Sequence, residues 1–188
     1  MAGERKQQIL ETLAKMLEAP KREKITTASL AAKLDVSEAA LYRHFTNKAQ
    51  MFEGLISFIE ETIFGLINKI GTEEPDGLRQ IQRTITMLLA FAEKNPGMTR
   101  VLIGDALVNE DDKLQVRINQ LYDRIEVTLK QSLRISETQS GSKGDAEAQA
   151  NLIVCFIIGR WQQFAKSGFK RKPTEYAQQQ ITTLINYY

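Results

Sequence analysis

The stretch that decides the fold is ITTASLAAKLDVSEAALYRHF, which runs from Ile25 to Phe45. It contains two short apolar-periodic segments with a break of three or four residues between them, which predicts two short helices. Thr26 or Thr27 caps the first helix, the turn falls at Asp35, and Ser37 caps the second helix. Two helices joined by so short a turn are typical of a helix-turn-helix, whose second helix fits the major groove of DNA.

The second of these helices has an apolar side and a side suited to DNA. Leu41 and Phe45 are four residues apart and are expected to face inward. The outward side and its flanks carry the candidate contacts Ala39, Ala40, Tyr42, Arg43 and His44. The alanines let the helix approach base edges, and Arg43 reaches a guanine or a phosphate. Alternatively, the two helices form an αα-hairpin that only packs.

Other residues near this helix are candidate phosphate contacts. Thr26 and Thr27 offer hydroxyl and backbone donors at a helix N-terminus, and Lys48 opens the following helix. Glu38 has two interpretations: it favours the positive end of its helix dipole, or it accepts from a cytosine amino group. His44 is either a phosphate contact or local donor, or a packing histidine.

The single histidine does not indicate catalysis. A metal site needs several ligands, and a catalytic triad needs an acid and a nucleophile beside its base. His44 and the only cysteine, Cys155, provide neither. We therefore expect no catalytic residue, no metal site and no cofactor.

Composition indicates a globular helical protein with a basic N-terminus. The 188 residues are 43% apolar and 26% charged, and only 4 prolines and 11 glycines interrupt them. Residues 1–48 hold nine Lys/Arg against six Asp/Glu, and the remainder holds 16 against 17, which favours a nucleic-acid partner at the N-terminus. No apolar run of about 18 residues or signal region is visible, so a cytoplasmic protein is expected.

Apolar periodicity predicts an all-α protein of about nine helices, with a helix-turn-helix head over residues 1–48 and a helical body over residues 49–188. Polar loops are expected at 71–77 and 136–145. Besides the two short helices, the expected helices are 4–19, 47–70, 78–95, 98–108, 111 to beyond 133, 146–167 and 174–187.

A dimer is expected because one short reading helix contacts too few base pairs for specific binding. Two heads about 34–36 Å apart read two half-sites one turn apart. The last two helices are the candidate interface, as an isologous four-helix bundle. Its candidate residues are Leu152, Cys155, Phe156, Gly159, Phe164, Ile181, Leu184 and Ile185.

The segment TTASLAAKLDVSEAALYRHFTNKAQMFEGL (Thr26–Leu55) resembles the DNA-binding region of the tetracycline-repressor (TetR) family, and LYRHFTNK is its most specific part. In that family three N-terminal helices form the reading head and the fourth joins it to a larger body. Asp35 stands where the family commonly carries glycine, and aspartate tolerates a left-handed backbone. The resemblance implies DNA contacts at Thr27, Glu38, Ala39, Ala40, Tyr42, His44 and Lys48.

The body resembles that of nucleoid occlusion factors within this family. The resemblance is carried by LLAFAEKNPGMTRVLIGDAL (Leu88–Leu107), RINQLYDRIEVTLKQSLR (Arg117–Arg134) and FKRKPT (Phe169–Thr174). It implies a dimer on palindromic chromosomal sites that antagonises the tubulin-like division protein FtsZ, whose tail docks between the fourth and fifth helices. The matching positions are Phe58, Leu66, Met87, Ala90, Lys94 and Asn95. Lys94 replaces an arginine usual there, and Phe58 and Met87 are alternatively core residues.

Three alternative functions are a ligand-responsive repressor with the same helix-turn-helix head, an interaction module and an enzyme. A ligand-responsive repressor needs a pocket in the body, which Trp161, Phe164 and Phe91 would line unless they fill the core. An interaction module that never touches DNA is a further alternative. A helical enzyme has no support, because no glycine-rich phosphate loop and no paired-carboxylate motif occurs.

Overall fold

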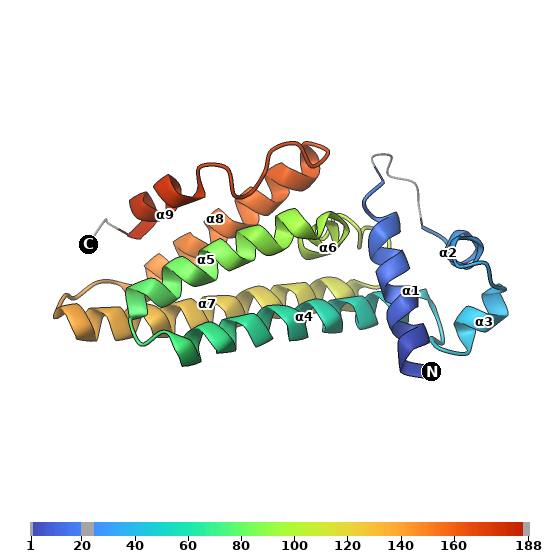
Figure 1. Cartoon of the computed structure of the whole chain (residues 1–188), viewed down its shortest axis with the longest axis horizontal. Helices are drawn as coiled ribbons and strands as arrows, with labels where there is room; N and C mark the ends of the chain where they lie inside the picture. Colours follow the sequence, from blue (N-terminus) through green and yellow to red (C-terminus); the bar gives the residue numbers. More distant parts are fainter. Residues whose placement is uncertain (1, 20–24, 186–188) are drawn as a thin grey trace. The chain divides into compact units, whose positions relative to one another are not determined.

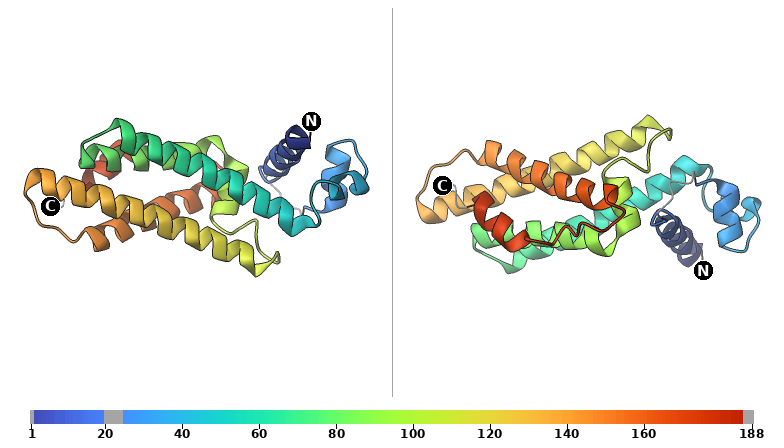
Figure 2. Two further views of the ribbon diagram at one scale, coloured as in Figure 1. Left: turned by 90° about the horizontal axis from the view of Figure 1, so that it is seen from below. Right: turned by 90° about the horizontal axis from the view of Figure 1, so that it is seen from above.

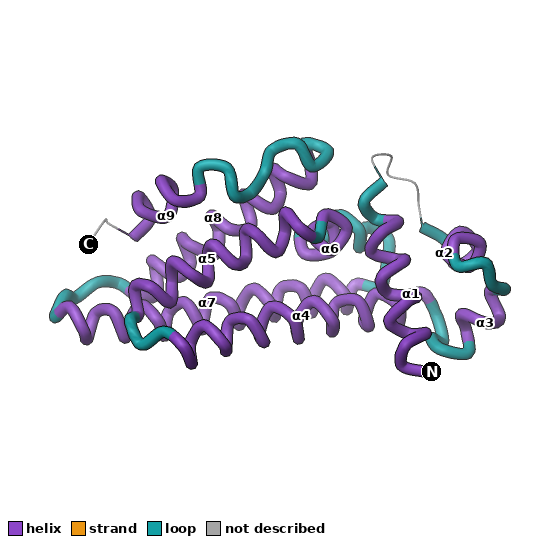
Figure 3. Tube along the Cα trace, viewed as in Figure 1, coloured by secondary structure: helices purple, strands orange, loops and turns teal. Residues whose placement is uncertain are grey.

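The described parts of the chain consist of helices joined by loops. A computed structural model describes residues 2–19 and 25–185, and within them it contains nine helices and no strand (Figures 1 and 3). The all-α class is therefore confirmed. None of these helices is long and apolar enough to cross a membrane. The helices are α1 (Ala2–Met16), α2 (Thr27–Lys33), α3 (Glu38–Tyr42), α4 (Lys48–Glu73), α5 (Gly77–Lys94), α6 (Pro96–Leu102), α7 (Asp112–Ser140), α8 (Ala146–Lys166) and α9 (Ala177–Ile185).

The chain divides into two compact units. The first comprises Met1–Ile59 and Asn95–Ile118, and the second comprises Glu60–Lys94 and Asn119–Tyr188. The first unit therefore holds the N-terminal helices together with α6 and the loop 103–111, and it is not limited to residues 1–48. Both α4 and α7 contribute residues to each unit.

The first unit is built around α1. This helix packs against α2 and α6, and α2 packs against α3. Arg117 fastens the start of α7 to α4, since its guanidinium donates to the Glu53 carbonyl and to Ser57 Oγ, both at 3.2 Å. The core of this unit includes Ile9, Leu13, Leu30, Leu41, Phe45, Met51, Phe52 and Leu55.

The second unit is organised around α5, which packs against α8 and α9 and can be followed in Figure 2. Within this unit the Arg124 guanidinium of α7 lies 3.7 Å from the centre of the Phe64 ring of α4. The buried Ser132 hydroxyl donates to Gln80 at 2.8 Å and links α7 to α5. The core includes Ile81, Ile85, Leu88, Ile157, Trp161, Phe164 and Ile181.

The fourth helix ends later than expected. It runs through Gly71 to Glu73, whereas the sequence predicted a break from Gly71. A glycine inside a helix costs only about 1 kcal/mol, but a proline pushes the residue before it out of the helical conformation. Pro75 therefore causes the break between the helices. The Asp76 side chain then accepts a hydrogen bond from the Arg79 amide at 2.8 Å, at the start of α5.

The seventh helix also outruns its predicted end. The loop expected from Ser136 instead begins after Ser140, where Gly141 adopts a φ of 71° and ends the helix in the left-handed conformation. The hydroxyls of Thr138 and Ser140 each donate to the carbonyl four residues earlier at 2.8 Å. Polar residues that satisfy themselves in this way do not break a helix.

Two other helices are shorter than predicted. The sixth ends at Leu102 instead of 108, and the ninth begins at Ala177 instead of Thr174. Arg160 explains the late start of the ninth, because it donates to the carbonyls of Lys172 and Glu175 at 2.8 Å and holds this stretch outside a helix. The end predicted at Tyr187 lies outside the described residues.

Candidate nucleic-acid interface and partner surfaces

The segment Thr26–Lys48, called the reading head below, begins with a capped helix. Thr26 is the N-cap of α2: its hydroxyl oxygen accepts from the Ser29 amide at 3.1 Å, and its own amide donates to Ser29 Oγ at 3.0 Å. This reciprocal pair satisfies two donors that a helix N-terminus leaves open. Thr26 therefore builds the start of the reading head while remaining exposed.

The turn between α2 and α3 depends on a left-handed residue. Asp35 has a φ of 54°, and the following Val36 amide donates to the Ala31 carbonyl at 3.0 Å. Ser37 then caps α3 by accepting from the Ala40 amide at 3.3 Å. The turn at Asp35 and the cap at Ser37 are both confirmed.

The third helix buries one side and exposes the other. Leu41 and Phe45 are 1% and 7% exposed, whereas Tyr42 is 45% exposed. The helix ends at Tyr42, so Arg43 is its C-cap and does not lie within the helix as expected. Ala39 and Arg43 are exposed, and Ala40 and His44 are half-buried.

A small hydrogen-bonded network joins α2 to α3 on this exposed side. Thr27 Oγ1 donates to Glu38 Oε2 at 2.6 Å, and the Tyr42 hydroxyl donates to Thr27 Oγ1 at 3.4 Å. Glu38 thus has a partner that neither of its sequence-based interpretations included. The network therefore holds Thr27, Glu38 and Tyr42, three predicted DNA contacts, in fixed positions relative to one another in the absence of DNA.

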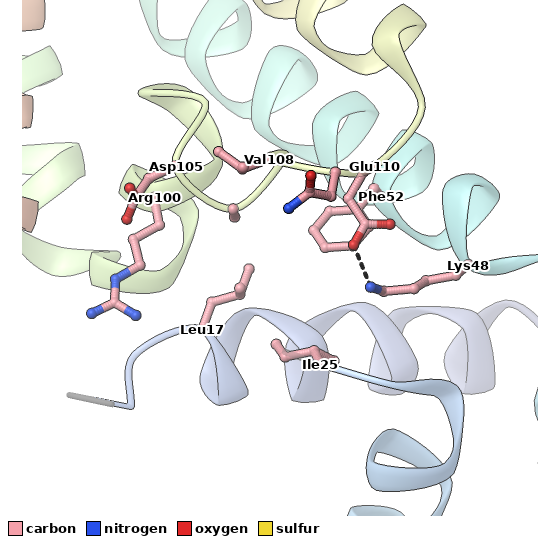
Figure 4. Close-up of a pocket in the computed structure, with 10 residues that line it drawn as sticks. Leu17, Ile25, Lys48, Phe52, Arg100, Asp105, Val108 and Glu110 are labelled. Atoms are coloured by element: carbon pink, nitrogen blue, oxygen red, sulfur yellow. Dashed lines mark hydrogen bonds and ion pairs between the residues drawn. The ribbon is translucent and has the colours of Figure 1, made fainter. Parts of the chain in front are cut away.

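Lys48, which the sequence suggested as a phosphate contact, has an acidic partner within the chain. Its Nζ forms an ion pair with Glu110 Oε1, and its side chain is only 22% exposed. The same Nζ lies 5.5 Å from the centre of the Phe52 ring. Figure 4 shows this pair at the edge of a cavity of about 280 Å³. The cavity is lined by Leu17, Ile25, Lys48, Phe52, Arg100, Asp105, Ala106, Val108, Asn109 and Glu110.

A groove of about 560 Å³ lies in the second unit between α4 and α5. Leu66, Met87 and Ala90, three of the six predicted partner contacts, line it together with residues that the sequence did not suggest. Leu66 is 39% exposed, so it is available on the surface. The additional lining residues are Lys69, Ile70, Glu73, Gln82, Arg83, Thr86 and Gln178.

The other three predicted partner contacts do not line this groove. Phe58 is 39% exposed, so it is not the core residue that its helical spacing suggested as the alternative. Lys94 is exposed as the last residue of α5. Asn95 is the N-cap of α6, and its carbonyl accepts from the Thr99 amide at 2.9 Å. Asn95 therefore has a structural role through its backbone.

The predicted dimer residues fall into two groups. Leu152, at 54%, and Cys155 are exposed, and Phe156, Gly159 and Leu184 are half-buried. Phe164, Ile181 and Ile185 are 2%, 1% and 7% exposed and lie in the core of their own unit, so they offer little surface to a second chain. The middle of the eighth helix, residues 152–158, is apolar on every side, so its periodicity does not reveal which stripe faces its own core.

The aromatic residues proposed to line a ligand pocket fill the core. Phe91, Trp161 and Phe164 are buried, and Trp161 Nε1 donates to the Leu88 carbonyl at 3.1 Å. Tyr122 lies beside Trp161 with ring centres 6.4 Å apart, and burial raises the pKa of the Tyr122 hydroxyl. These aromatic side chains are part of the packed core, so they do not support the alternative of a ligand-responsive repressor.

Comparison with known proteins agrees with this geometry. The family model described as "Bacterial regulatory proteins, tetR family" matches residues 9–55, and the one described as "Tetracyclin repressor-like, C-terminal domain" matches residues 75–188. The nucleoid occlusion factor SlmA of Alteromonas mediterranea is 54% identical over 173 residues, which cover 91% of this chain and 89% of that protein. The chain belongs to the SlmA family of TetR-type regulators.

Further members of the SlmA family and of the wider fold are similar to the chain. The SlmA of Shewanella halifaxensis is 50% identical over 181 residues, which cover 95% of this chain and 91% of that protein. A solved TetR transcription regulator from Haloarcula marismortui has a TM-score of 0.82 at 16% identity, covering 98% of this chain and 97% of that one, and shares the fold. TetR-type proteins are DNA-binding regulators, and this chain is not an enzyme.

Sequence reasoning missed one residue beside the reading head and several in the groove. Glu110 lies 62 residues from its partner Lys48, so no local pattern connects the two. Arg83 and Glu73 form an ion pair at 3.2 Å across two helices. Only packing of distant segments brings these charges together, and periodicity does not report such packing.

Proposed function

We propose that this protein is a nucleoid occlusion factor: a homodimer that binds palindromic chromosomal sites and inhibits assembly of FtsZ over the nucleoid. The observation that carries the proposal is the exposed side of α3, held outward by the buried Leu41 and Phe45. Membership of the SlmA family supports the same conclusion. The protein would then act in the cytoplasm, associated with the nucleoid.

The reading head has the dimensions and chemistry for a major groove. Ala39 and Ala40 let the backbone of α3 come close to base edges and offer methyl groups to thymine. Arg43 then reaches a guanine or a phosphate, and Tyr42 donates to a phosphate. We assign the remaining phosphate contacts around this helix to Thr26, Thr27, Ser37, His44 and Lys48, with Glu38 oriented by Thr27.

The dimer would form through the side of α8 that the chain itself leaves uncovered. Leu152 and Cys155 are exposed there, and Phe156 and Gly159 are half-buried. Leu184 of α9 adds a further half-buried apolar side chain. A two-fold axis through this surface makes a self-complementary contact, which matches a palindromic site.

The groove between α4 and α5 is the proposed site for FtsZ. Its floor is apolar through Leu66, Met87 and Ala90, and Lys69 and Arg83 stand among its charged residues. Both cations contact Glu73, at 3.7 Å and 3.2 Å. A short peptide with apolar side chains and a carboxylate complements such a groove, because the carboxylate can replace Glu73 as partner of a cation.

Titration of a labelled palindromic duplex tests the DNA-binding part. We expect the chain to bind as whole dimers, and R43A should cost about 1–3 kcal/mol of binding if Arg43 reads a base. M87E changes the groove and should leave the affinity for the duplex unchanged. A wild type that binds no duplex would favour an interaction module, and an R43A variant that binds as tightly as the wild type would remove Arg43 from the DNA contacts.

A further inference from the structure

Lys48, a proposed DNA contact, forms an ion pair with Glu110, which lies outside the reading head. Lys48 is the first residue of α4, and Glu110 lies in the loop 103–111 that joins α6 to α7 (Figure 4). Their side chains are 22% and 13% exposed, so both are largely removed from water. Both residues belong to the first compact unit.

The loop holds Glu110 in place. The Glu110 amide donates to the Leu107 carbonyl at 3.0 Å, and Leu107 is itself buried. Asn109 has a φ of 66°, a conformation that asparagine tolerates, and the chain turns there toward Lys48. This turn fixes the Glu110 backbone, and its side chain, which is 13% exposed, has less freedom than that of an exposed glutamate.

The Glu110 carboxylate and a DNA phosphate can both bind the ammonium group of Lys48, so they compete for it. A lysine ammonium is a point charge with three donors, and it binds anionic oxygens of either kind. A phosphate contact releases counterions and appears in the salt dependence of binding only when the cation is available to the duplex. Lys48 meets that condition only after it leaves, or shares, Glu110.

We propose that Glu110 limits DNA affinity by acting as an intramolecular competitor for Lys48. The inference rests on the proposed DNA-binding function and adds a residue that sets its strength. Binding of a duplex then transfers Lys48 from Glu110 to a phosphate and frees the loop 103–111 from its contact with α4.

The test compares charge-matched variants of the full chain on a fluorescein-labelled duplex of mixed sequence, since phosphate contacts do not depend on sequence. E110Q should bind about three- to tenfold more tightly than the wild type. Its plot of log affinity against log salt, between about 50 and 200 mM, should keep the wild-type slope, because Lys48 reaches a phosphate in both proteins. D112N makes the same change in net charge at the exposed start of α7 and should leave the affinity unchanged.

A double variant separates competition from a general charge effect. In a K48M background E110Q should no longer raise the affinity, because the competed cation is absent. Circular dichroism melts confirm that each variant is folded. Equal or weaker binding by E110Q, or a gain that persists with K48M, would overturn the inference while leaving DNA binding intact. Failure of the wild type to bind any duplex would instead overturn the proposed function and this inference with it.

Discussion

At the scale of single residues, the turn of the reading head depends on Asp35. Its φ of 54° lies in the left-handed region, where most side chains collide with the backbone. Aspartate tolerates this conformation better than most residues, because its short side chain can hydrogen-bond locally. The departure from the glycine common in the family is therefore compatible with an intact turn, as the sequence predicted.

Substitution of Asp35 should reveal this strain. D35A should lower the free energy of unfolding by about 1 kcal/mol, because alanine lacks the local hydrogen bonding that eases a left-handed backbone. D35G should lower it less or raise it slightly, since glycine adopts this φ freely. Urea denaturation of the three proteins measures the order. A D35A chain as stable as D35G would contradict the strained turn.

Gly97 is required for a different reason, the close approach of α6 to α1. A Cβ built on Gly97 would overlap the carbonyl oxygen of Ala14, which is backbone and has no room to yield. We expect G97A to cost about 1–3 kcal/mol of unfolding free energy, as overpacking does. G65A is the matched control on an exposed, open position of α4, where alanine should instead add about 0.5–1 kcal/mol. Equal effects in urea melts would refute the close approach.

The residues of the reading head illustrate what a sequence can and cannot reveal. The inward Leu41 and Phe45 and the caps at Thr26 and Ser37 follow from spacing and side-chain chemistry alone. The bond from Thr27 to Glu38 does not, because the distance between two side chains on different helices depends on how those helices cross. For the same reason, the ion pair of Lys48 with Glu110 could not be predicted from the sequence.

At the scale of elements, the helices themselves were predictable and their ends were less so. Apolar spacing identified α5 and the long α7, but it placed the end of α7 near Ser136, whereas the helix runs to Ser140. Hydroxyl groups that bond back to their own helix give no apolar signal. The late start of α9 depends on Arg160, whose contacts with distant carbonyls no local pattern shows.

The connection between α8 and α9 is tied to α5 by Glu93. Burial alone would raise the pKa of the Glu93 carboxyl, but hydrogen bonds from Thr174 and the nearby Lys172 cation, at 3.6 Å, together lower it below 4.5. A lowered pKa means that the ionised carboxylate stabilises the fold above its ordinary pKa. That stabilisation is lost as the pH falls through the folded-state pKa.

This sign gives a prediction for pH dependence. The wild type should be more stable than E93Q at neutral pH, and the difference should shrink as the pH falls below about 4.5. Thermal melts between neutral and acidic pH measure the difference. E175Q removes an exposed carboxylate of the same connection and should show no such trend. A difference for E93Q that stays constant across this range would refute the contribution of the ionised group.

At the scale of the whole molecule, the main uncertainty that sequence reasoning left was the division between core and interface. Phe164, Ile181 and Ile185 have the same apolar character as Leu152, and only the packing of α5 against α8 and α9 shows that the first three are internal. The sequence predicted that the last two helices form the interface, and burial in the structure selects the outward residues proposed for it.

The proposed dimer is tested by a charge placed on that outward surface. L152R should convert a dimer to a monomer without loss of helical content, because Leu152 is 54% exposed within its own chain. V116R changes a valine exposed to a similar degree, 53%, in the other unit and should remain dimeric. Sedimentation equilibrium distinguishes the two states. A dimeric L152R together with a monomeric V116R would move the interface away from α8.

The most direct test of the account is sedimentation of FtsZ polymer with the full chain, in the presence and absence of its palindromic duplex. We expect the wild type to reduce the amount of pelleted FtsZ, more strongly with the duplex than without it. R43A should lose the dependence on DNA, and M87E should lose the inhibition while still binding the duplex. Pelleted FtsZ that is unchanged by the wild type bound to DNA would contradict the account and indicate a transcriptional repressor with the same reading head.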